Sequence, residues 1–119
     1  MTDALLTPND VVKHLGQLGR DLDATVRMLK DADLAAALLR HDADLAESRA
    51  FLAATGSVDA RKHEACLATE KVEREALEAE AGVRYLRARV KAIELRTEIG
   101  RSVNAVLRTE MQLLPSQEG

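Results

Sequence analysis

The chain contains one place where turn-forming residues meet a helix start signal, and this place divides it into two long arms. Gly56 is followed by Ser57, and turn residues coincide with a helix start nowhere else between Pro8 and Pro115. Ala, Leu, Glu and Arg dominate the sequence, and all four are strong helix formers. The sequence therefore predicts an all-α fold, a long antiparallel helical hairpin resembling a coiled coil.

The expected hairpin is a single domain. Thr7 can cap the first helix and Pro8 suits its first position, while Ser57 can cap the second helix with Asp59 in its first turn. The pattern leaves open whether the first arm is continuous or broken near residue 31. We expect one domain over residues 1–114, with arms at about 8–55 and 57–113, a turn at 56, and a disordered tail over residues 115–119.

Apolar residues recur at spacings of three and four along both arms, as on the contact face of a packed helix. In the first arm we expect this stripe to rotate slightly as it continues, and in the second arm we expect it to shift near its end. A pair of helices buries only one stripe on each, so the pattern predicts self-association, most simply two hairpins in a four-helix bundle. The predicted oligomer seam is Leu15, Leu22, Leu29, Val83, Leu86, Val90 and Ile93; the first-arm stripe also includes Val26, Leu38, Leu45 and Leu52, and the second-arm stripe ends in Ile99, Val103 and Val106.

Charge is unevenly distributed along the chain. The formal net charge is −3, yet residues 82–114 carry seven Lys or Arg against three Glu. This asymmetry indicates either an anionic partner at the basic end or pairing of the acidic arm with the basic arm. If the arms fold back evenly about Gly56, Val11 lies beside Arg101, and residues 102–113 project beyond the first arm.

Residues that could perform catalysis or hold a metal do not form a recognisable set. His63, Cys66 and Glu70 share a helical face, but zinc takes about four ligands and no second Cys lies nearby. The glutamates around residue 75 alternate with Lys and Arg, as on a solvated helix. We expect no enzymatic activity, no cofactor, no metal and no small-molecule substrate.

The chain has a single cysteine, Cys66, and its first residues lack the basic start and apolar core of a secretory signal. The longest apolar run, Leu34 to Leu39, is far shorter than the ~20 residues that span a bilayer. These features predict a cytoplasmic protein with no membrane partner.

Basic side chains recur at helical spacing in the second arm. Such rows can follow the phosphates of a nucleic acid, and the competing interpretation is ion pairing within the helical bundle. Tyr85 is the only aromatic residue in this segment, whereas single-strand binders usually stack bases on several. The candidate nucleic-acid contacts are Arg84, Arg87, Lys91, Arg96, Arg101, Asn104 and Arg108.

The end of the second arm, ATEKV followed by VRYLRARVKAIELRTEIGRSVNAVLRTEM, resembles the closing helix of small helical proteins of tailed bacteriophages. It is most similar to that of UvsY-type recombination mediators. The resemblance covers under half of the chain. It implies an oligomeric, non-enzymatic factor that binds single-stranded DNA and helps to load a recombinase, with Arg96, Arg101, Asn104 and Arg108 as the main contacts.

Two other functions need only the apolar stripes. One is a structural or adaptor coiled-coil protein of a phage-type assembly. The other is a regulatory helical module that binds a protein partner through an exposed stripe.

Overall fold

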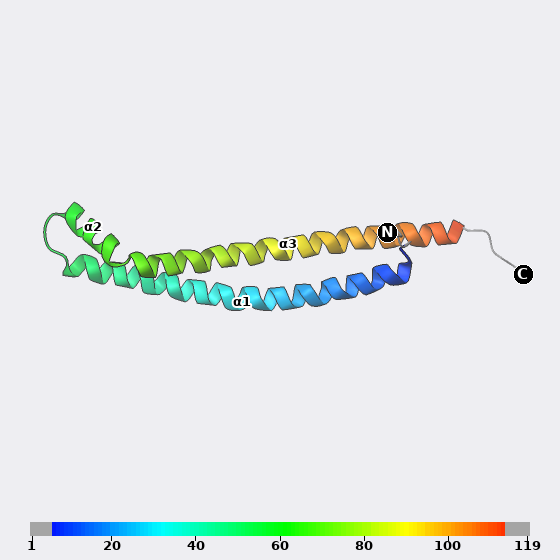
Figure 1. Ribbon diagram of the computed structural model, residues 1–119, viewed down its shortest axis with the longest axis horizontal. Helices are drawn as coiled ribbons and strands as arrows, with labels where there is room; N and C mark the ends of the chain where they lie inside the picture. Colours follow the sequence, from blue (N-terminus) through cyan, green and yellow to red (C-terminus); the bar gives the residue numbers. More distant parts are fainter. Residues whose placement is uncertain (1–5, 114–119) are drawn as a thin grey trace, which may run out of the picture. The chain divides into compact units, whose positions relative to one another are not determined.

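The computed structural model describes residues 6–113, which form three helices and no strand. These helices are α1 (Pro8–Ala53), α2 (Val58–Ala68) and α3 (Glu70–Leu113), coloured along the chain in Figure 1. The predicted all-α fold is confirmed. The tail expected at residues 115–119 lies outside the described residues.

Contacts divide the described chain into two units, each of which pairs a part of α1 with a part of α3. Unit 1 contains residues 6–26 and 88–113, and unit 2 contains residues 27–87. Within unit 2, Asp33 pairs with Arg87 and Arg40 pairs with Glu80. Residue numbers thus rise along α1 as they fall along α3, so the two helices run antiparallel.

The start signals act as the sequence predicts. The Thr7 hydroxyl accepts a hydrogen bond from the Asp10 backbone N–H at 3.1 Å, and the Asp10 carboxylate accepts one from the Thr7 N–H at 3.1 Å. The pKa of Asp10 is lowered, because hydrogen bonds from the Thr7 hydroxyl and from the Thr7 backbone N–H favour its charged carboxylate. Ser57 caps α2 by accepting from the Ala60 N–H at 3.2 Å.

The turn lies at the predicted residue. Gly56 has φ +109°, in the left-handed region that glycine adopts at little cost, and it joins the end of α1 to the cap of α2. Helix α1 passes through residue 31 without interruption, which answers the question that the sequence leaves open.

The second arm differs from prediction, because it bends where a single helix was expected. Thr69 separates α2 from α3 with φ −111° and ψ 11°. Its hydroxyl donates to the Ala65 carbonyl at 2.8 Å, in addition to the backbone bond to the same oxygen. A β-branched residue that bonds back to the preceding turn commonly bends a helix, and Thr69 fits that description.

The expected offset between the arms agrees with unit 1, where Val11 lines a hollow together with Gly100 and Val103. The projecting end is shorter than expected, because Thr7, Pro8 and Asn9 line another hollow with Arg108 and Met111. Figure 1 shows the end of α3 extending past the start of α1.

Candidate interaction surfaces

Helices α1 and α3 turn one row of residues toward each other, which we call the inner seam. In unit 1 it buries Val11, Leu18 and Thr25, each seven residues after the last. In unit 2 it is made largely of alanine, with Ala36 and Ala43 buried on α1. Burial recurs at alternating spacings of four and three, the pattern of a coiled coil.

The side chains predicted for the oligomer seam all lie in the inner seam. Their burial arises within one chain and requires no second copy. Val83, Leu86 and Ile93 are buried, and Leu15, Leu22, Leu29 and Val90 are half-buried.

The predicted rotation and shift of the stripes are wrong. On α1 the seam continues in strict register through small residues, so Thr25 is buried while Val26 is exposed. On α3 it continues through the half-buried Thr97 and the buried Gly100. Larger apolar side chains were expected to follow the seam and instead face outward, because the heptad spacing and not side-chain size decides which residues meet. Val103 is half-buried, and the exposed residues are Val26, Leu38, Leu45, Leu52, Ile99 and Val106.

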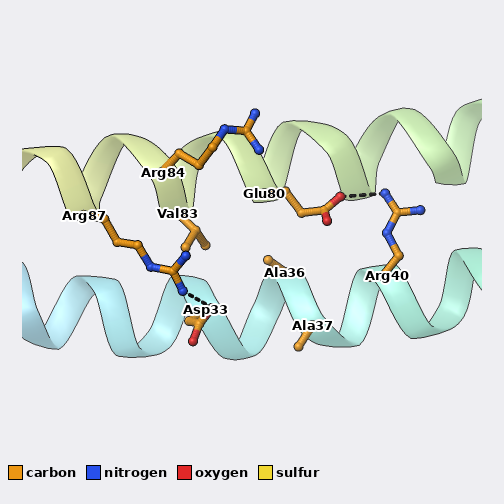
Figure 2. Close-up of a pocket in the computed structure, with 8 residues that line it drawn as sticks. All are labelled: Asp33, Ala36, Ala37, Arg40, Glu80, Val83, Arg84 and Arg87. Carbon is orange, nitrogen blue, oxygen red and sulfur yellow. Dashed lines mark hydrogen bonds and ion pairs between the residues drawn. The ribbon is translucent and has the colours of Figure 1, made fainter.

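A charge cluster flanks the inner seam in unit 2, and Figure 2 shows Arg40 reaching from α1 toward Glu80 on α3. The Arg40 guanidinium lies 2.6 Å from Glu80 and 2.8 Å from Glu73. The hydrogen bond from Arg40 is the main cause of a lowered pKa at Glu80, and Arg84 adds to it through its charge. The cluster pins the register of the two helices, since charges beside a coiled-coil seam select how the helices pair.

Of the two predicted nucleic-acid contacts in unit 2, Arg87 is engaged with the first arm. Arg87 lies 3.5 Å from Asp33, and both side chains are exposed. Arg84 lines a surface hollow together with Arg40 and Glu80, and it makes no ion pair within residues 6–113. Pairing between the arms, the competing interpretation of the charge asymmetry, accounts for Arg87.

The basic residues of unit 1 have a different environment. Lys91, Arg96, Arg101 and Arg108 are exposed and make no ion pair within residues 6–113. In unit 2, Asp33 and Arg40 lie seven residues apart on one flank of the inner seam of α1. Counted back in further steps of seven, the same flank carries Val26, Gly19 and Val12 in unit 1. Among residues 6–113, Arg101 and Arg108 thus have no acidic residue opposite them on this flank.

Asn104 does not share the exposed face of its neighbours. The side chain is half-buried at an inner-seam position, and its Oδ1 is buried without a hydrogen-bond partner among the described residues. The predicted row of Arg101, Asn104 and Arg108 is therefore incomplete, because Asn104 turns inward while the two arginines remain exposed.

Two apolar surfaces that the sequence interpretation did not recognise lie on the face opposite the inner seam. On α3 in unit 1, exposed side chains recur at four and seven residues; on α1 in unit 2, a similar row repeats this spacing. Counting along the sequence in alternating steps of four and three residues, from Leu95 or from Leu34, identifies the two rows. We call Leu95, Ile99, Val106 and Leu113 the α3 apolar face, and Leu34, Leu38, Leu45 and Leu52 the α1 leucine face.

His63, Cys66 and Glu70 do not form a metal centre. Among residues 6–113, no group of three or more His, Cys, Asp or Glu side chains is placed to hold a metal ion. The Cys66 thiol is exposed. No helix in the described part of the chain has the length and apolar character to cross a membrane.

Comparisons with known proteins identify no relative: no family model, curated protein or solved structure matches this chain.

Proposed function

We propose that this protein is a non-enzymatic helical adaptor that binds a partner helix along the α3 apolar face. The observation that carries the proposal is the row of Leu95, Ile99, Val106 and Leu113, which are 55–79% exposed although they repeat with coiled-coil spacing. Helical partners dock through apolar anchors at three, four and seven residue spacings. The exposed Cys66 thiol suits a reducing compartment, and we place the protein in the cytoplasm.

The charges of unit 1 suggest the chemistry of the partner. Arg96, Arg101 and Arg108 surround the outer part of α3 with positive charge that no described acidic residue neutralises. An amphipathic helix with acidic flanks would complement both the apolar face and the arginines. The adaptor would then join its partner to whatever the rest of the hairpin binds.

Affinity capture followed by mass spectrometry tests the adaptor function. The bait is the full chain, compared with the double variant Ile99→Asp/Val106→Asp and with Leu67→Asp, whose parent side chain is exposed on α2 away from both faces. We expect proteins that the native chain and Leu67→Asp retain and the double variant loses. Equal recovery by all three baits would contradict the proposal.

A second candidate function is binding of single-stranded DNA, as in the recombination mediators that the end of the chain resembles. The specific observation in its favour is that Arg101 and Arg108, seven residues apart on α3, are both exposed and unpaired within residues 6–113. Arginines so placed can contact successive phosphates. A recombinase would be the protein partner in this case.

Fluorescence anisotropy separates the two candidates. A DNA-binding chain should bind a labelled single-stranded oligonucleotide in a salt-dependent manner and lose binding in Arg101→Glu/Arg108→Glu. The Ile99→Asp/Val106→Asp variant should retain it. Absence of binding by the native chain at low salt would remove the DNA-binding candidate and leave the adaptor.

A further inference from the structure

The α1 leucine face is a second coiled-coil seam, complete in its spacing. His41 and Ser48 fill the positions between the leucines, so residues 34–52 alternate in steps of four and three. Each residue of this row is two positions from an inner-seam residue such as Ala36 or Ala43. Two positions turn an α-helix by about 200°, so the two seams lie on opposite faces of α1.

The distribution of side-chain size over these two seams is unusual. In unit 2 the seam that α1 turns toward α3 contains Ala36, Ala43 and Ala50, while Leu34, Leu38 and Leu52 are 56–75% exposed. Hydrophobic stabilisation grows with the apolar area removed from water. The exposed apolar area of these leucines therefore remains available for contact with another helix.

The charges beside the α1 leucine face are self-complementary. Asp42 and Arg49 lie on one flank of the row, seven residues apart, and neither makes an ion pair within residues 6–113. In an antiparallel pair of helices, residues on the same flank face each other, as Asp33 and Arg87 do within unit 2. A two-fold axis near residue 43 would place Asp42 of each copy beside Arg49 of the other.

The same register completes the apolar layers. Leu34 would pack on Leu52 of the second copy, and His41 and Ser48 would each meet a leucine. No polar seam residue would face its own counterpart. A parallel pair would instead stack His41 on His41 and Ser48 on Ser48, and it would place Arg49 opposite Asp44 while leaving Asp42 opposite Ala37.

We propose that the α1 leucine face binds a second copy of this chain in antiparallel orientation, held in register by two Asp42–Arg49 ion pairs. This interface lies in unit 2 and is independent of the partner proposed for the α3 apolar face.

Multi-angle light scattering over a range of micromolar concentrations tests the interface. The native chain should approach twice 13.0 kDa, and Leu38→Lys and Leu45→Lys should each weaken association by about tenfold or more, since each removes a buried leucine from both copies. Circular dichroism should show unchanged helicity, because both leucines are exposed in the single chain. Leu67→Lys is the matched control and should remain dimeric.

A charge exchange tests the orientation. Asp42→Arg and Arg49→Asp should each weaken the dimer, and the double variant should restore it; Asp44→Arg should have little effect. A parallel pair would give a different pattern, with Asp44→Arg weakening association and Asp42→Arg leaving it intact, which would overturn the antiparallel register. A monomeric native chain, or a dimer that persists in Leu38→Lys and Leu45→Lys, would overturn the interface itself.

Discussion

Leu15 on α1 occupies the space left by the missing side chain of Gly100 on α3. A Cβ added at position 100 would lie 2.7 Å from Leu15 Cδ2, and Gly100 is buried in the inner seam of unit 1. The contact explains why a glycine is accommodated in the middle of a long helix, where it costs stability. The large side chain of Leu15 on α1 lies opposite Gly100 on α3, which has no side chain.

Two glycines of α3 should respond differently to alanine. Nothing lies within 4 Å of a Cβ at Gly82, so Gly82→Ala should raise the free energy of unfolding by about 1 kcal/mol through helix propensity. Gly100→Ala should gain less, because Leu15 must move. Urea unfolding measures both, and in a Leu15→Ala background the Gly100→Ala gain should approach that of Gly82→Ala. Equal gains in the native background would contradict the Leu15 contact.

Two leucines of α3 in unit 2 test the inner seam. Leu86 is 9% exposed and Leu77 is 53% exposed. Leu86→Ala should lower the free energy of unfolding by about 2–3 kcal/mol, because it leaves a space in the seam. Leu77→Ala should change it by no more than about 0.5 kcal/mol. Similar losses at the two positions, measured by urea unfolding, would argue against the assigned face.

Asn104 should be a source of instability in unit 1. Its Oδ1 is buried without a partner among residues 6–113, and such an acceptor loses its hydrogen bonds to water on folding. Asn104→Leu should raise the free energy of unfolding by about 1 kcal/mol, measured by thermal unfolding with Ser102→Leu as a surface control. A destabilised Asn104→Leu would show that the amide has a partner in solution.

The Arg40 cluster should make stability depend on acid pH. The pKa of Glu80 is lowered in the folded chain, chiefly by its hydrogen bond from Arg40. Its contribution is therefore present above the unfolded pKa of about 4.3 and is lost as the pH falls through the folded value.

The Glu80→Gln variant checks this link, because glutamine does not titrate. Its melting temperature should be lower than that of the native chain at neutral pH, and it should fall less steeply between neutral pH and about pH 3, below the unfolded glutamate pKa. Glu78, exposed and outside the cluster, supplies the control variant Glu78→Gln. Parallel pH profiles for all three proteins would show that Glu80 does not cause the loss of stability at acid pH.

Local signals in the sequence predict the fold well. The caps at Thr7 and Ser57 and the turn at Gly56 depend on residues close in the chain, so their chemistry is visible without the structure. The interaction surfaces are harder to predict. Ranking residues by hydrophobicity places Leu38 and Leu45 in the seam, although both are exposed. The seam instead follows strict spacing through Ala36 and Ala43, which contribute little hydrophobic signal.

Local sequence patterns also do not predict which charged residues of the two arms form ion pairs. The packing of α1 against α3 decides which charges meet, so Arg87 acquires an acidic partner in Asp33. The side chains of Arg101 and Arg108 acquire none among the described residues. A count of Lys and Arg along the chain cannot make this distinction.

Each chain fills its own inner seam and leaves its outer faces for partners. Oxidation of the variant Leu15→Cys/Gly100→Cys, with Cys66→Ser to remove the native thiol, tests it most directly. Disulfides need Cβ atoms roughly 3.5–4.5 Å apart. A Cβ at position 100 would lie 3.5 Å from Leu15 Cγ, the atom bonded to the Cβ of that residue. On denaturing electrophoresis without reductant, we predict a cross-linked single chain with altered mobility. Cross-links found only between chains would contradict the claim.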